Sequence, residues 1–71
     1  MNNVCFRGTI RSVEDGQLLV RNWDGCQDVV VFYDGACRFS CGQCVRVHYN
    51  GIMTLSLPPQ VTADCVEQIA C

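Results

Sequence analysis

Residues 44–63, CVRVHYNGIMTLSLPPQVTA, decide the fold, because the other strands of the chain must be placed around this stretch. Apolar and polar side chains alternate over residues 44–50, and this period of two predicts a half-buried strand. Asn50 followed by Gly51 is typical of a tight hairpin turn, so we expect residues 52–57 to form the returning strand. The stretch therefore predicts antiparallel β-structure.

The C-terminal part of the chain predicts one more strand. Pro58 and Pro59 should interrupt the sheet, because proline cannot donate a hydrogen bond to a ladder. Alternation resumes after them and favours a strand over residues 60–69. Asp64 followed by Glu67 also resembles a helix capping box, but the run is short for a stable helix.

Upstream of residue 44, the sequence shows the same β character. Residues 4–11 alternate around Gly8, and a glycine inside a strand predicts a bend or a bulge. Asp-Gly pairs at 15–16 and 24–25 predict two turns with a strand between them. Residues 28–33 are apolar on both faces, which predicts a central strand of the sheet.

Size and charge exclude several classes of function. The chain has 71 residues, enough for one domain with a small core. This length leaves no room for a catalytic barrel or a two-lobed cleft, so we do not expect an enzyme. The five basic residues are all arginine and the net charge is -2, whereas a nucleic-acid binder usually carries a strongly basic stripe.

Three segments carry a resemblance to a known family: RGTIRSVEDGQLLV at 7–20, VVVFYDGACRF at 29–39 and VRVHYNGIMTLSLPPQVTA at 45–63. They resemble the YobA-like small bacterial domains of unknown function. The resemblance implies an all-β fold, a small, partly closed β-barrel of five to six strands. The barrel would be of the oligonucleotide/oligosaccharide-binding (OB) type, and it would bring no established activity or ligand. We expect a single domain over residues 1–71, with the connection 34–43 crossing the end of the barrel.

The N-terminal segment has no charged head followed by a long apolar run, and no later run is long enough to cross a bilayer. Members of the YobA-like family are often exported lipoproteins, and the leader of such proteins is not recognisable here. The chain is therefore expected to be cytoplasmic. In that compartment its seven cysteines should be thiols or metal ligands, and an odd number cannot pair completely within the chain.

Cys37, Cys41 and Cys44 are candidate metal ligands with the spacing C-x3-C-x2-C. The same spacing holds the iron–sulfur cluster of radical S-adenosylmethionine enzymes, but those enzymes need a much longer barrel. Structural zinc would need a fourth ligand, and His48 lies about 13 Å from Cys44 along a strand, too far to share one ion. Plain thiols, a metal site with a more distant ligand, and a disulfide or redox role therefore all remain open.

Trp23 and Arg21 are candidate ligand-binding residues. They lie on one face of the predicted second strand, where they could stack on a base or a sugar ring as aromatic residues do in OB barrels. Aromatic residues in such positions more often cover a barrel end or a dimer contact.

The sequence thus predicts a non-enzymatic binding or interaction module for an unknown ligand or protein partner, with a homodimer left open. It predicts no cofactor and no membrane association, and it argues against nucleic acid. One alternative is a cysteine-rich metal-binding or thiol-redox protein. Another is a weak binder of single-stranded nucleic acid or sugar.

Overall fold

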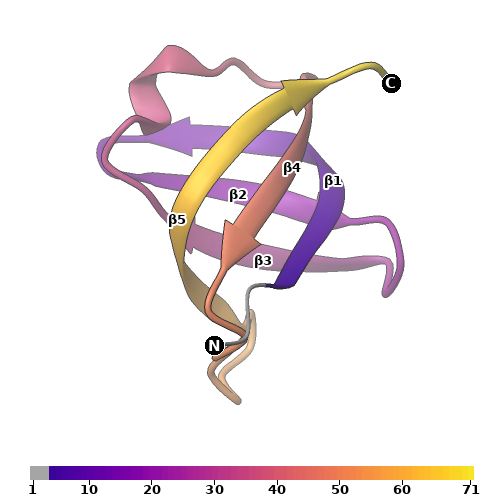
Figure 1. Ribbon diagram of the computed structural model, residues 1–71, viewed down its shortest axis with the longest axis vertical. Coiled ribbons are helices and arrows are strands. Elements are labelled where there is room, and N and C mark those ends of the chain that lie inside the picture. Colours follow the sequence, from indigo (N-terminus) through magenta and orange to yellow (C-terminus); the bar gives the residue numbers. More distant parts are fainter. Residues whose placement is uncertain (1–3) are drawn as a thin grey trace.

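Five strands close into a barrel in the computed structural model, which describes residues 4–71 (Figure 1). The strands are β1 (Val4–Glu14), β2 (Gln17–Asn22), β3 (Gln27–Phe32), β4 (Cys44–Tyr49) and β5 (Gln60–Ile69), and a short 3-10 helix, η1 (Ala36–Arg38), lies between β3 and β4. Their order around the barrel is β1-β2-β3-β5-β4, and β4 pairs back onto β1. Only the β3–β5 pair is parallel. The predicted all-β class is confirmed, and this closed, five-stranded arrangement fits a small OB-like barrel.

The long strand β1 closes the barrel because it pairs on both sides. Its first half pairs with β4 and its second half with β2, and the two pairings overlap at Gly8 and Thr9. A Cβ atom on Gly8 would lie 2.3 Å from the backbone oxygen of Arg21 and 2.6 Å from a methyl group of Val20, so only glycine fits there. The predicted irregularity is present in β1, but the register shift lies further along, between Ile10 and Ser12.

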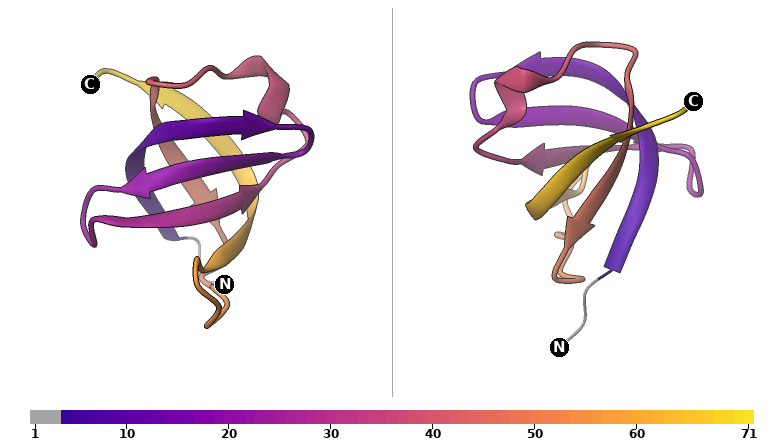
Figure 2. Two further views of the ribbon diagram at one scale, coloured as in Figure 1. Left: turned by 180° about the vertical axis from the view of Figure 1, so that it is seen from behind. Right: turned by 45° about the horizontal axis from the view of Figure 1, so that its top comes forward.

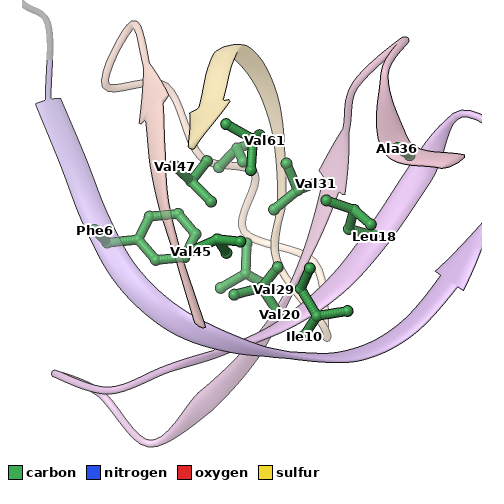
Figure 3. Packing of buried hydrophobic residues seen from close by; sticks show 11 residues of the cluster. Phe6, Ile10, Leu18, Val20, Val29, Val31, Ala36, Val45, Val47 and Val61 are labelled. Carbon is green, nitrogen blue, oxygen red and sulfur yellow. The ribbon is translucent and has the colours of Figure 1, made fainter. Parts of the chain in front are cut away.

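The core is made of inward-facing side chains from all five strands, all aliphatic except Phe6 (Figure 3). Val45 and Val47 are fully buried, as the alternation in β4 predicts. In β3 the inward Val29 and Val31 are buried, whereas Phe32 at the strand's end is 38% exposed. The strand is nevertheless central, because β2 and β5 pair with its two edges.

Residues 33–43, here called the plug connection, cover one end of the barrel. Ala36 in η1 is completely buried and belongs to the core cluster. The connection is tied to β1 by two backbone hydrogen bonds: Gly42 N donates to Ile10 O (2.8 Å), and Ile10 N donates to Gln43 O (2.9 Å). Its course confirms the prediction that this segment crosses the barrel end.

The prediction of a returning strand over residues 52–57 was wrong. Gly51 has the positive φ (92°) expected of a turn, but the chain beyond it runs as an irregular loop until β5 begins. The reason is that β4 has β1 on one edge and β5 on the other, so no edge remains for a further strand. The predicted strand over residues 60–69 is present as β5.

Candidate functional site

Trp23 lies in the turn after β2 and is held by its own chain. Its indole Nε1 donates a hydrogen bond to the hydroxyl of Thr9 (2.9 Å), and the guanidinium of Arg7 sits over the ring at 5.7 Å from the centroid. The side chain is 38% exposed. Its polar atom and one ring face are therefore already engaged, which reduces what it can offer a base or a sugar.

Arg21 is brought close to Trp23, because Thr9 is its cross-strand partner on β1. Its guanidinium is engaged as well, since Nε donates to Asp28 Oδ1 at 2.6 Å across the β2–β3 pair. The predicted binding residues thus share one patch of the outer wall. The charge that would attract an anionic ligand is compensated by Asp28 within that patch.

The structure does not assemble Cys37, Cys41 and Cys44 into a metal site. Cys44 forms a disulfide with Cys71, so its sulfur is not available as the thiolate that a metal requires. Cys37 and Cys41 are exposed free thiols. Among residues 4–71, no group of three or more histidine, cysteine or acidic side chains is placed to hold an ion.

The Cys44–Cys71 disulfide departs from the expectation that the cysteines are thiols or metal ligands, and it realises the disulfide alternative for one pair. It joins residues 27 apart and holds the chain's last residue against the outside of β4. Cys44 is buried, with the hydroxyl of Thr9 at 3.9 Å from its sulfur. Sequence spacing could not select this pair, because the two cysteines approach only once β5 lies beside β4.

His48 lies on the outer face of β4 and pairs with a carboxylate. Its Nε2 is 2.8 Å from Glu67 Oε1, and Arg46 Nη1 is 3.5 Å from the same oxygen. The hydrogen bond from His48 holds the pKa of Glu67 below its ordinary value, with a further contribution from the neighbouring positive charges. Cys5 and Cys65 flank His48 on the adjacent strands, but its short contact is with Glu67 rather than with either thiol.

A different feature is more unusual for a domain of this size. Residues 50–59, here called the apolar loop, project from the end of the barrel opposite η1 (Figures 1 and 2). Three of its aliphatic side chains face solvent: Ile52 is 70% exposed, Leu57 87% and Leu55 100%. Single exposed aliphatic residues are common, but several on one projecting loop indicate a contact surface.

The hydroxyl side chains of the apolar loop form local hydrogen bonds, some of them to the first residue of β5. Thr54 N donates to Gln60 O (3.0 Å), and Gln60 N donates back to the Thr54 hydroxyl (2.9 Å). The Thr54 and Ser56 hydroxyls are 2.7 Å apart, and the Ser56 hydroxyl also donates to Pro58 O (3.0 Å). Pro58 and Pro59 have no N–H to satisfy. Burial of the loop against a partner would therefore leave neither the two hydroxyls nor the two prolines with an unpaired donor.

A cavity of about 170 Å³ lies where the apolar loop meets the ends of β3 and β5. Phe32, Ile52 and Val61 form the apolar part of its lining, and four uncharged polar residues complete it: Asn50, Thr54, Gln60 and Thr62. The projecting leucines and this cavity therefore occupy the same end of the molecule.

Sequence reasoning missed the apolar loop as a candidate site because it interpreted residues 52–57 as a strand. One signal was available: residues 47–63 contain no Asp, Glu, Lys or Arg. A solvent-exposed hairpin usually carries charged residues. Their absence around the turn at Asn50 and Gly51 therefore indicates a contact surface.

Comparison with known proteins adds no relative: no family model, curated protein or solved structure matches this chain. A search of residues 4–71 for a helix long and apolar enough to cross a membrane finds none.

Proposed function

We propose that the protein is a non-enzymatic interaction module whose contact surface is the apolar loop. The observation that carries the proposal is the exposure of Ile52, Leu55 and Leu57 on a loop whose hydroxyl groups are paired locally. The barrel acts as a rigid support for this loop, because both strands that flank it, β4 and β5, are paired along the barrel wall.

The magnitudes favour contact by burial of apolar surface. Full burial of one leucine or isoleucine side chain stabilises a complex by about 1.5–3 kcal/mol, so the three residues supply roughly 5–9 kcal/mol before the cost of association. No charged residue lies in the loop, so an apolar, uncharged partner surface fits it better than nucleic acid does.

The alternatives have weaker support. Trp23 and Arg21, which would serve a base or a sugar, are engaged with Thr9, Arg7 and Asp28. A metal site built on Cys44 would first require reduction of its disulfide. Membership of the YobA-like bacterial domains, with an OB fold, is part of the same proposal and rests on the sequence resemblance. A cytoplasmic location is a separate expectation, which the Cys44–Cys71 disulfide opposes because disulfides are rare in that compartment.

A photo-crosslinking side chain tests the proposal directly. We place it at position 55 in the protein expressed in cells, with a control at Arg38, an exposed position at the other end of the barrel. Discrete protein adducts at position 55 that are absent at position 38 are expected. No adduct at position 55, or the same adducts at both positions, would contradict a contact role for the loop.

A further inference from the structure

We infer that the partner of the apolar loop is a second copy of this chain, bound so that a leucine from each loop enters the other copy's cavity. This inference rests on the proposed function and identifies its partner. The two features involved are the projecting Leu55 and Leu57 and the cavity lined by Phe32, Ile52 and Val61.

The placement of these features suits a two-fold axis. In a symmetric dimer the same patch of both copies must complement itself, so a projection and a recess are needed side by side. Both occur at this end of the barrel, and Ile52 belongs to both, since it lies on the apolar loop and lines the cavity. A loop that only entered a groove on another protein would not need a recess beside it.

The cavity has a suitable size and chemistry for a leucine side chain. A dry protein cavity of about 150 Å³ holds benzene, which has six carbon atoms. The cavity here measures about 170 Å³, and the branched side chain of leucine has four carbon atoms. Phe32, which is 38% exposed, supplies an apolar wall that the entering side chain would cover.

The absence of charge favours self-association over a foreign partner. In a two-fold interface a charged group near the axis faces its own copy, and like charges repel. Neither residues 47–63 nor Phe32 carries a carboxylate, an ammonium or a guanidinium. The centre of the interface is therefore free of such repulsion, whereas Asp34 and Asp64, which line the neighbouring hollow, and the net charge of -2 on each copy oppose association.

The area available indicates a weak dimer. A standard interface covers about 800 Å² of each partner, and the chain exposes 4503 Å² in all. The apolar loop and cavity supply only the centre of a patch of that size. We therefore expect a dissociation constant on the order of 10–100 μM.

Sedimentation equilibrium of the purified protein from ~1 μM to ~1 mM tests the inference. The wild type should pass from monomer to dimer across this range. Leu55→Ser should weaken the dimer at least about tenfold, because a central anchor residue is lost. Leu19→Ser, on the half-buried outer face of β2, is the matched control and should leave the dissociation constant unchanged.

A second variant tests the cavity. Thr62→Trp places a large side chain at an exposed position on the cavity lining and should block dimerisation while leaving the loop leucines intact. A mixture of the Leu55→Ser and Thr62→Trp proteins keeps one of the two reciprocal contacts. It should form a heterodimer that is tighter than either variant's homodimer and weaker than the wild type. Urea unfolding of each variant confirms that it is folded.

A wild type that stays monomeric at ~1 mM, or a dimer that Leu55→Ser does not weaken, would overturn the inference. So would position-55 crosslinks that join the chain only to a different protein or to lipid. A different protein as the adduct leaves the proposed function standing, because the loop would still be a contact surface. A wild type that stays monomeric and forms no adduct at position 55 would contradict both the dimer inference and the proposed function.

Discussion

The two long connections of the barrel use apolar residues in opposite ways. The plug connection and the apolar loop lie at opposite ends and have similar lengths (Figure 2). Ala36 in the plug connection is fully buried, whereas Leu55 in the apolar loop is fully exposed. The first bonds to β1 through Ile10, whereas in the second the Thr54 and Ser56 hydroxyls bond to each other and to Pro58 O. Hydrophobicity alone therefore does not decide which of these segments is buried.

The order of the strands explains the difference. β3 and β4 are separated by β5, so the connection between them must cross the barrel end and can cover the core there. β4 and β5 are neighbours, and Tyr49 at the end of β4 pairs with Ala63 near the start of β5. A connection between neighbouring strands has little distance to span, so its residues are free to project from the barrel.

The largest difference in the free energy of unfolding is expected when a carboxylate is introduced into each of the two connections. Ala36→Glu buries a carboxylate without a partner and should lower the free energy of unfolding by at least ~3 kcal/mol. A core of this size supplies only about 3–5 kcal/mol, so this loss would remove most of the stability. Leu55→Glu should change that free energy by no more than about 0.5 kcal/mol. Urea unfolding monitored by circular dichroism measures both, and equal effects would refute the contrast between the ends.

Loss of the disulfide should have the next largest effect. Cys71→Ser opens a loop closed across 27 residues and should lower the free energy of unfolding by about 3 kcal/mol. Cys37→Ser is the control, because Cys37 is an exposed free thiol, and it should have little effect. If the cross-link only braces the barrel, folded Cys71→Ser should still dimerise through the apolar loop. A thiol titration of the native protein should find five free thiols, and seven would show that the bond is absent.

The smallest effect is expected at Glu67, on the barrel wall away from both connections. Its pKa is lowered in the folded protein, so the ionised carboxylate contributes stability above its unfolded pKa. That contribution is lost as the pH falls through the lowered folded value. The stability difference between wild type and Glu67→Gln should therefore shrink as the pH falls below the ordinary carboxyl value of 4.5. Urea unfolding at a series of pH values measures it, and a difference that grows on acidification would contradict the role of the His48 pair.

Local sequence patterns were sufficient to predict most strands and turns of the barrel. Alternation predicted β4 and β5, and the Asp15 and Gly16 pair predicted the turn between β1 and β2, where Gly16 has a φ of 77°. These features depend on residues close together in the chain, so their signals are local. The same local logic failed at residues 52–57, where alternating apolar residues form an exposed loop.

The candidate site depended on information that no local pattern holds. Trp23 and Arg21 were correctly placed on the outer wall, but their engagement with Arg7, Thr9 and Asp28 comes from strand pairing. Cys44 and Cys71 come together for the same reason.

By itself, the sequence determined that the chain is all-β and where most of its strands and turns fall. Only the tertiary structure decided that β4 has no free edge, that Cys44 pairs with Cys71, and that Leu55 and Leu57 project beside a cavity. The physical reason is that strand formation follows from each residue's neighbours in sequence. In contrast, three features depend on which strands become neighbours when the barrel closes. They are a free strand edge, an unpaired thiol and an exposed apolar surface.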